Sequence, residues 1–325
     1  MKYHFCTYFD ANYICLGLAL HESLTNTCED FTLYVCCLDA KVFEILTEMN
    51  LPTIVPLKLS DIEIFDPEFA ATQQNRSIVE YYFTLSPILP SYIFSCYPEI
   101  NLVTYLDSDL YFYSSPEPMF NEFDNNSLSL IGHRFPPELE FREKFGKYNL
   151  QCQIYRRDNN TTECLKWWRE RCIEWCYDRL EGDKFADQKY LEQWSSLFNG
   201  VKVIEHKGAG LAPWNWFQYD ISLDDNKITI DQQPLIFYHF QGFRILGTRF
   251  ISHNLGSYGH SMNRQLLNFF YNDYYHSLKR AEAKLTLTKA AQNINLKSNL
   301  KRTGFSNLRG YLSAIKHHNL MFVKP

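Results

Sequence analysis

The chain lacks the glycine-rich loops that hold phosphate groups in many nucleotide-binding proteins. Neither G-x-G-x-x-G nor G-x-x-x-x-G-K occurs among its 325 residues, and this excludes the usual dinucleotide site and the P-loop. If the protein binds a nucleotide, its phosphates must be held in another way. A metal ion bound by carboxylates is one such way.

A C-x-x-C pair is also missing, although the chain has ten cysteines. They are scattered through apolar segments, and Cys172 and Cys176, which lie one helical turn apart, have no clustered His or Cys that would complete a zinc site. We therefore expect them to be small buried side chains in a reducing cytoplasm and not a disulfide framework.

Long hydrophobic runs and an excess of positive charge are absent as well. Residues 5–20 are partly apolar, but Asp10 and Asn12 interrupt them, so we expect neither a signal peptide nor a membrane-spanning helix. The net charge of −5 gives no argument for nucleic acid as a partner. With 46% hydrophobic residues, the chain can fill the core of one large domain, or of one domain with an appendage. We expect the protein to be in the cytoplasm.

The most informative segment is 102–113, an apolar and aromatic run that Asp107 and Asp109 interrupt. It is typical of a buried strand that ends in two carboxylates, at the edge where open α/β sheets bind ligands. Carboxylates so close repel each other unless a proton, hydrogen bonds or a cation intervene, and Mg²⁺ or Mn²⁺ would accept these oxygen ligands. The alternative is that the two side chains only cap a turn.

Strands and helices alternate along the chain, which predicts an α/β fold with a parallel sheet and right-handed crossovers. The expected strands are 3–9, 31–38, 53–55, 127–131, 150–155, 201–204 and 235–239. The expected helices are 17–24, 41–49, 77–85 (ended by Pro87 and Pro90), 161–179 and one that begins near 185.

Four segments occur in the same order as in a known family. They are TYFDANY (7–13), YLDSD (105–109), FADQKYL (185–191) and YHFQG (238–242). Together they resemble the GT-A nucleotide-sugar glycosyltransferases, especially the retaining family 8 enzymes and related bacterial cell-surface-glycan transferases. The resemblance covers roughly residues 3–245 and implies a Rossmann-like, mostly parallel sheet flanked by helices. We expect a catalytic domain over 1–264. The tail after about Arg264 lies outside the resemblance, and we expect a helical, basic C-terminal extension over 265–325.

The resemblance also implies a role for individual residues. Asp107, Asp109 and His239 would hold Mn²⁺ or Mg²⁺ against the donor diphosphate, and Asp187 and Gln188 would lie at the reacting sugar carbon. Asp187 has a structural alternative, which is to cap the helix that follows it. The residues expected to bind the donor are Tyr8, Asp10, Asn12, Arg76, Glu80, Ser108, Asn149, Gly242 and Arg244.

The implied function is metal-dependent transfer of a sugar, hexosyltransferase-like and retaining, from a nucleotide-diphosphate donor to a glycan or lipid-linked acceptor of the cell surface. A UDP-sugar is favoured. The loop 208–215, which contains Trp214, either shapes the acceptor side or is only a turn, and the sequence favours neither. Two residues depart from the family, because Gln151 replaces the glycine of Asn-x-Gly and Ile245 replaces a lysine.

Two other functions stay open. A non-catalytic protein that binds sugar nucleotides or glycans on a transferase fold is favoured by Gln151, which would crowd the donor pocket. A phosphatase of the haloacid dehalogenase type also uses a strand-end D-x-D, but it needs Thr or Val where this chain has Tyr111.

The last part of the chain, from Ala283 onward, has no acidic residue, and its Lys and Arg alternate with apolar side chains. It is either a solvated helical tail or a basic amphipathic surface for peripheral contact with an anionic membrane.

Overall fold

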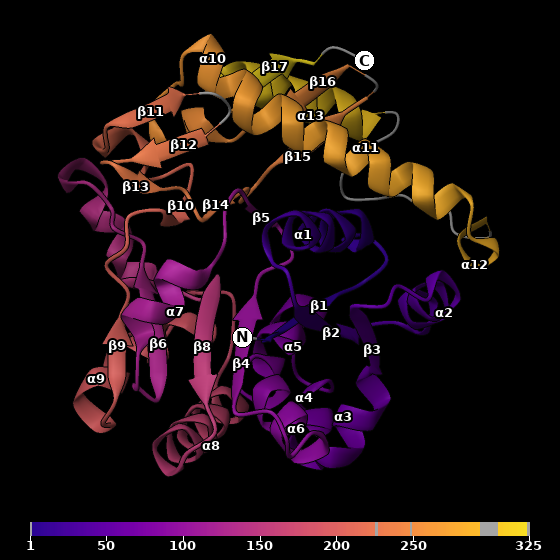
Figure 1. Cartoon of the computed structure of the whole chain (residues 1–325), viewed down its shortest axis with the longest axis vertical. Coiled ribbons are helices and arrows are strands. Elements are labelled where there is room, and N and C mark those ends of the chain that lie inside the picture. Colours follow the sequence, from indigo (N-terminus) through magenta and orange to yellow (C-terminus); the bar gives the residue numbers. More distant parts are fainter. Residues whose placement is uncertain (1, 225–226, 248, 293–304, 324–325) are drawn as a thin grey trace.

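The computed structural model describes residues 2–224, 227–247, 249–292 and 305–323. A mixed sheet runs through the molecule in the order β3-β2-β1-β4-β8-β6-β7, with β9 beside β6 (Figure 1). Its strands are β1 (Tyr3–Phe9), β2 (Phe31–Cys37), β3 (Ile54–Lys58), β4 (Leu102–Leu106), β6 (Leu128–Gly132), β7 (Tyr148–Asn149), β8 (Cys152–Arg156) and β9 (Val201–Val203). The strands β3, β2, β1 and β4 are parallel, whereas β8 is antiparallel to β4 and β6. The predicted α/β class, with a mostly parallel sheet flanked by helices, is confirmed.

Two hydrophobic clusters lie on opposite faces of this sheet, because successive strand residues point to opposite sides. In β1, Phe5 and Phe9 join one cluster and Cys6 joins the other. The first face is covered by α1 (Ile14–Thr27), α2 (Ala40–Met49) and α7 (Glu117–Phe123). The second face is covered by α3 (Leu59–Phe65), α4 (Pro67–Thr72), α5 (Ile78–Leu85), α6 (Ile88–Cys96) and α8 (Asn159–Glu174).

The chain leaves the large sheet at the turn that holds Asp107 and Asp109. The strand after this turn, β5 (Leu110–Phe112), joins a smaller sheet in the order β10 (Ala209–Leu211), β14 (Phe237–His239), β5. Because β5 and β14 are antiparallel, with His239 opposite Leu110, the end of β14 lies beside the turn. The predicted strand that ends at the two carboxylates is β4, and residues 110–112 form a second strand in another sheet.

Three predictions about helices need correction. A separate helix, α6, follows α5, because Pro90 falls in its first turn, where a backbone N–H is not needed. The helix α8 ends at Glu174 and not at 179. The helix expected near 185 is instead a short 3₁₀ turn, Gln188–Gln193, followed by α9 (Trp194–Leu197).

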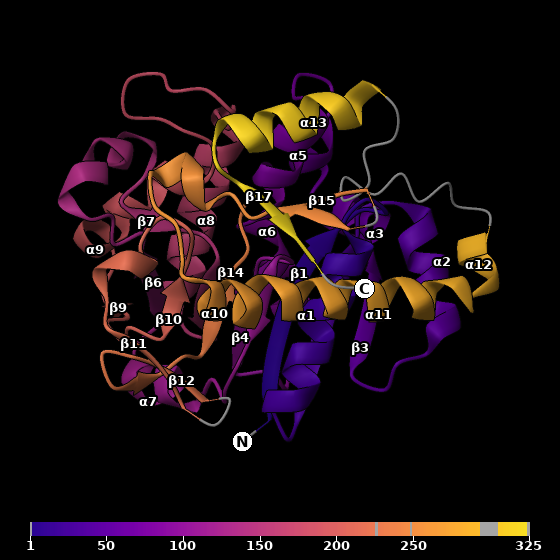
Figure 2. The ribbon, with the colours of Figure 1, turned by 90° about the horizontal axis from the view of Figure 1, so that it is seen from above.

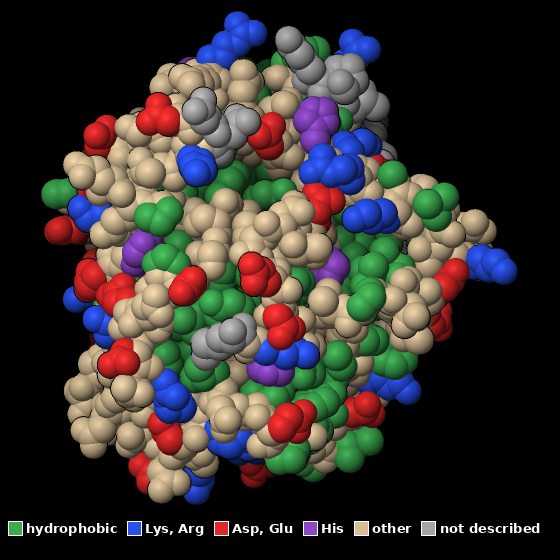
Figure 3. All heavy atoms as spheres, in the orientation of Figure 1, with side chains coloured by type: hydrophobic (Ala, Val, Ile, Leu, Met, Phe, Trp, Pro, Cys, Tyr) green, Lys and Arg blue, Asp and Glu red, His purple; other side chains and the backbone are tan. Residues whose placement is uncertain are grey.

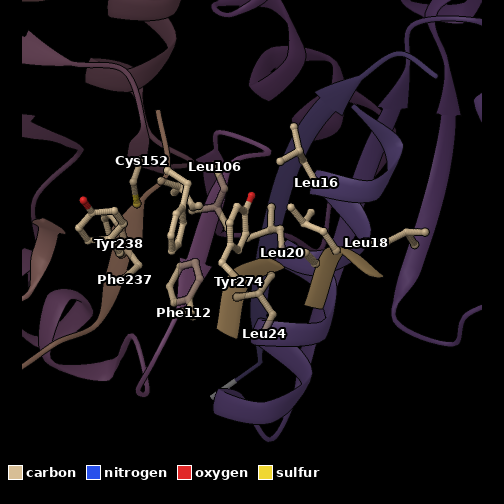
Figure 4. Packing of buried hydrophobic residues seen from close by; sticks show 14 of the residues in the cluster. Leu16, Leu18, Leu20, Leu24, Leu106, Phe112, Cys152, Phe237, Tyr238 and Tyr274 are labelled. Atoms are coloured by element: carbon tan, nitrogen blue, oxygen red, sulfur yellow. The ribbon is translucent and has the colours of Figure 1, made fainter. Parts of the chain in front are cut away.

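The C-terminal part packs against helices that cover the first face of the sheet. After α10 (Arg264–Leu267) and a π-helical turn (Asn268–Asn272), α11 (Asp273–Thr286) lies along α1 (Figure 2). Glu22 of α1 accepts hydrogen bonds from Ser277 and Arg280, and Tyr274 is buried in the same cluster as Leu24 and Phe112 (Figure 4). A division of the chain at residue 264 stays a prediction.

The remaining strands form two small sheets. One is the antiparallel meander β11 (Ile221–Asp224), β12 (Lys227–Ile230) and β13 (Gln233–Pro234). The other combines β15 (Arg244–Leu246) and β16 (Phe250–Ser252) with β17 (Leu320–Phe322) near the end of the chain. Before β17 come α12 (Lys289–Gln292) and α13 (Phe305–Lys316), whereas Lys297, Lys301 and Arg302 of the predicted basic tail lie outside the described residues.

Three further observations concern the chain as a whole. All ten cysteines are described and free; nine of them are buried, and Cys96 is exposed. Among the described helices, none combines the length and the apolar character needed to cross a membrane. On the face shown in Figure 3, basic and acidic side chains are interspersed.

Candidate active site

The structure brings the three predicted metal ligands together. Asp107 and Asp109 follow β4, and His239 is the last residue of β14. The Nε2 atom of His239 lies 3.0 Å from Oδ1 of Asp109 and 3.8 Å from Oδ2 of Asp107. One potential ligand atom from each of the three residues lies within 4.8 Å of the others.

The charges of this triad fit a divalent cation. Burial raises the pKa of Asp107 to about 6; His239 opposes this rise and Asp109 adds to it. Burial alone lowers the pKa of His239, but Asp109 and Asp107 outweigh it, so the net shift is upward. Two carboxylates and an imidazole this close are a donor set suited to Mn²⁺ or Mg²⁺, whose charge would relieve the repulsion between the carboxylates.

Two cavities meet at the triad, with volumes of about 370 and 420 Å³. They share Tyr8, Phe83, Asp107 and Asp109 as lining residues. We call the smaller one the N-terminal cavity, because its other lining residues come from positions 9–13, 38, 78–82, 105 and 108. We call the larger one the loop cavity, because most of its other lining residues, between positions 133 and 258, lie outside the regular strands and helices.

The predicted donor-binding residues Tyr8, Asp10, Asn12 and Ser108 all line the N-terminal cavity. Asp10 accepts hydrogen bonds from the backbone N–H of Asn12 at 2.9 Å and from its side-chain amide at 3.0 Å. These bonds fix the carboxylate at the turn before α1. Carboxylate oxygens accept more than one hydrogen bond, so Asp10 keeps capacity for a ligand.

Asp187 and Gln188 line the loop cavity together with Asn149. The side chain of Asp187 is buried, and it does not cap the turn that follows it. Instead, its Oδ2 accepts a 2.6 Å hydrogen bond from Ser86, whose hydroxyl lies 3.2 Å from the Tyr8 hydroxyl. Burial raises the pKa of Asp187 to about 7, although the bond from Ser86 lowers it.

The backbone around Asp187 is also held in an unusual way. Ala186 has a φ of +46°, a left-handed conformation that is unfavourable for a residue with a Cβ atom. The carbonyl of Asp187 accepts a 2.9 Å hydrogen bond from the indole of Trp168, and the Gln188 amide donates to the carbonyl of Phe145. The two candidate catalytic side chains are therefore fixed from several sides.

Four of the predicted donor-binding residues lie outside the lining of both cavities. Arg76 stacks on Tyr177 and donates to the carbonyl of Ile173, and Glu80 closes a capping box with Ser77 at the start of α5. Gly242 has a φ of +74° in the turn after β14, and Arg244 is exposed at the start of β15. Their roles at the donor stay predictions.

Sequence reasoning missed several residues of the loop cavity. Among the described residues that line the two cavities, Arg142 is the only Arg or Lys. It belongs to the irregular 3₁₀ segment Pro137–Phe145, and it lies over the ring of Tyr258. Aromatic side chains surround this cavity, and of these only Tyr8 and Trp214 were candidates from the sequence. They are Tyr8, Phe83, Phe135, Phe145, Phe185, Trp214 and Tyr258.

Comparison with known proteins adds relatives and distant structural neighbours. No protein-family model matches the chain. It is 31% identical to YfnD of Bacillus subtilis over 86% of this chain and 89% of that protein, and 32% identical to YfnF of the same organism over 74% and 82%; both relatives are described as uncharacterized.

Similar solved structures include the galactosyltransferase LgtC in complex with donor and acceptor sugar analogs (TM-score 0.48, 17% identity, 74% of this chain and 87% of that chain). Mouse xyloside xylosyltransferase 1 has a TM-score of 0.48, with 14% identity over 74% and 98%. The glycosyltransferase GlyE of Streptococcus pneumoniae also has a TM-score of 0.48, with 15% identity over 90% and 66%.

Proposed function

The chain belongs to the same family as YfnD and YfnF of Bacillus subtilis, and from the geometry of its cleft we propose that it is a metal-dependent glycosyltransferase. The observation that carries this proposal is the position of Asp107, Asp109 and His239, which converge where two cavities meet. A donor that spans this junction would have its nucleoside in one cavity and its sugar in the other. The favoured donor is a UDP-sugar.

The proposed reaction moves a sugar between two oxygen atoms. The bond between the anomeric carbon and the diphosphate oxygen breaks, the acceptor hydroxyl oxygen bonds to that carbon, and the hydroxyl proton passes to water. A bound Mn²⁺ or Mg²⁺ would supply a positive charge to the diphosphate, which leaves with an extra negative charge.

The chain's own residues would position the donor and stabilise the reacting carbon. Asp10 would accept a hydrogen bond from the nucleobase, and Tyr8 and Asn12 flank it in the N-terminal cavity. Asp187 and Gln188, in the loop cavity, would place negative charge and an amide dipole near the anomeric carbon as it becomes positive. We propose a retaining outcome on the resemblance to family 8 alone.

The aromatic lining of the loop cavity supports a glycan, or a glycan on a lipid carrier, as the acceptor. Rings such as Phe145 and Phe185, whose centroids lie 4.9 Å apart, offer flat apolar surfaces to the C–H faces of a sugar. Arg142 would face an anionic group of the donor or acceptor. A role in building cell-surface polysaccharide follows from the resemblance.

The two rival functions are less well supported. The binding-only alternative depended on Gln151 in the donor pocket, but Gln151 is not a lining residue of either cavity. In a phosphatase of the haloacid dehalogenase type Asp107 would be the nucleophile, but this chain has Tyr111 at the position where that family needs Thr or Val.

Peripheral contact with a membrane is also proposed. On α13, the exposed side chains Leu308, Leu312 and Ile315 recur at helical spacing, beside Arg309 and Lys316. We expect the protein to sediment with anionic liposomes at low salt and to be released by added salt. We propose a cytoplasmic location. If the protein ignores such liposomes, it makes no membrane contact through its tail.

The function is tested by incubating the protein with a panel of nucleotide sugars and Mn²⁺. Thermal shift would identify the donor that binds, and release of the nucleoside diphosphate would report turnover. We expect turnover with a UDP-sugar, its loss in EDTA and its return with Mn²⁺ or Mg²⁺. Full turnover in EDTA would contradict the metal site, and binding without turnover would favour the binding-only alternative.

A further inference from the structure

Gln151 connects the two chain segments that carry the proposed metal ligands. It lies in the bend between β7 and β8, and its side chain is fully buried. Its carbonyl accepts a 2.9 Å hydrogen bond from the backbone N–H of Asp107, and its side-chain Oε1 lies 3.1 Å from Nδ1 of His239. One residue therefore contacts both the strand-end turn and the imidazole.

The contact with His239 determines which ring nitrogen is available to a metal. A neutral imidazole carries one proton, and it binds a metal only through the other nitrogen. The amide oxygen of Gln151 accepts a hydrogen bond and therefore favours the proton on Nδ1. The Nε2 atom lies 3.0 Å from Oδ1 of Asp109. Without a metal, a proton on Nε2 would be donated to this carboxylate, and a metal bound between Asp107 and Asp109 would take the place of that proton while Nδ1 keeps its own.

The surroundings of Gln151 and His239 hold this arrangement in place. The backbone N–H of Gln151 donates to the side-chain oxygen of Asn149 at 2.9 Å, which fixes the bend. On the other side, the ring of Trp214 packs edge-on against His239, with centroids 5.4 Å apart. The hydrogen bond to Gln151 and the ring of Trp214 therefore both restrict rotation of the imidazole.

A purely structural role accounts poorly for an amide at this position. The side-chain nitrogen of Gln151 has no hydrogen-bond partner in the described part of the chain, although it is buried. Burying an unpaired amide is unfavourable, and an apolar side chain of similar volume would avoid this cost. The amide is useful here only through its oxygen.

We propose that Gln151 is a positioning residue that holds His239 in the Nδ1–H form, with Nε2 directed at the metal position between Asp107 and Asp109. This inference rests on the metal site of the proposed function. It gives a role to the residue that replaces glycine in the family that the chain resembles. Gln151 acts on the metal side of the site and does not obstruct the donor cavities.

The test measures Mn²⁺ binding to the full chain without any donor, from the electron paramagnetic resonance signal of free Mn²⁺. Gln151→Met keeps the side-chain volume and removes the acceptor, so we expect it to weaken binding by about 10- to 100-fold, as for other residues that orient metal ligands. Gln151→Glu keeps an acceptor oxygen and should bind within a few-fold of the wild type, by analogy with carboxylates that orient ligating histidines.

Gln153→Met is the matched control. Gln153 is also fully buried near the start of β8, but its amide donates to the carbonyl of Asn149 and not to His239. We expect this variant to bind Mn²⁺ like the wild type. Near-UV circular dichroism would establish that each variant is folded.

A second readout does not depend on a variant. Nitrogen-15 NMR of His239 in the metal-free wild type should find a proton on Nδ1, hydrogen-bonded to Gln151. A ring protonated only at Nε2, or a folded Gln151→Met that binds Mn²⁺ like the wild type, would overturn the role of Gln151 but leave the proposed metal site intact. A wild-type chain that binds no Mn²⁺ would overturn the metal site and, with it, this inference.

Discussion

The N-terminal cavity and the loop cavity differ in how the chain builds them, although they share Asp107 and Asp109. The first is lined by the end of β1, the turn before α1 and one side of α5, elements that pack on the parallel half of the sheet. The second is lined by side chains from many separate segments, among them Arg142, Trp214 and Tyr258. Half of the residues that line the first cavity belong to strands or helices, whereas most of those that line the second do not.

This difference separates two tasks. Regular elements held by two core clusters keep a pocket in one shape, which suits a part of the substrate that does not vary, such as a nucleoside. Loops change in sequence at little cost to the core, and they commonly carry specificity. We therefore assign the donor nucleotide to the N-terminal cavity and the acceptor to the loop cavity, and the predictions below test this division.

The largest effect is expected where the cavities meet. Asp109→Asn removes a negative charge from the proposed metal site but keeps the shape of the side chain. We expect donor turnover to fall at least about a hundredfold, the scale for losing a charge-stabilising group at a transition state. Mn²⁺ binding should weaken as well.

Asp30→Asn, at an exposed carboxylate before β2, is the matched control and should leave turnover unchanged. If Asp109→Asn keeps full turnover in EDTA, no metal is needed where the two cavities meet, and the proposed metal site is wrong.

The buried carboxylate of the loop cavity should make stability depend on pH. Because the pKa of Asp187 is about 7 in the folded protein and near 4 in the unfolded chain, the folded state keeps a proton that the unfolded chain has lost. The stability from this group is complete at low pH and is lost as the pH rises through 7.

Asp187→Asn cannot ionise, and its amide oxygen still accepts the bond from Ser86. Between pH 5 and pH 7, we expect the wild type to lose about 2 kcal/mol in free energy of unfolding relative to this variant. Urea unfolding across that range measures the difference. Parallel curves for the two proteins would mean that Asp187 is not the buried titrating group.

Sequence reasoning was more successful for one cavity than for the other, and the reason is physical. Tyr8, Asp10 and Asn12 are close together in the chain, so one motif contains the positions that the fold keeps together. That His239 lies beside Asp107 and Asp109 could be predicted only from a second motif, YHFQG. The antiparallel pairing of β5 with β14, which brings these residues together, cannot be inferred from either strand alone. Strand alternation and helical periodicity were enough for the parallel half of the sheet.

The rest depends on tertiary contacts without a local signature. Arg142 and Tyr258 lie in short 3₁₀ segments, and nothing in their sequence shows that they face one cavity. The role of Gln151 was hidden for the same reason, since its partner His239 is 88 residues away. The extra helix α6 was missed because Pro90 was taken as an end and not as part of a first turn.

A smaller effect is expected at the nucleobase end of the N-terminal cavity. If Asp10 accepts a hydrogen bond from the imino group of uracil, UDP should bind more tightly than ADP, since adenine lacks that donor. Asp10→Ala should remove most of this preference, about 1–2 kcal/mol or roughly tenfold. Calorimetry with both nucleotides measures it, and equal affinities in the wild type would refute the assignment.

The smallest effects should distinguish the two cavities most directly. Phe145→Leu removes a ring from the loop cavity, and Tyr13→Leu removes one from the mouth of the N-terminal cavity. An aromatic contact contributes about 0.5–1.5 kcal/mol, so each change should weaken one ligand by about 2- to 10-fold. We expect Phe145→Leu to raise KM for the acceptor without changing UDP affinity, and Tyr13→Leu to weaken UDP without changing the acceptor KM. If both variants weaken both ligands equally, the cavities form one binding unit and the proposed division between donor and acceptor is wrong.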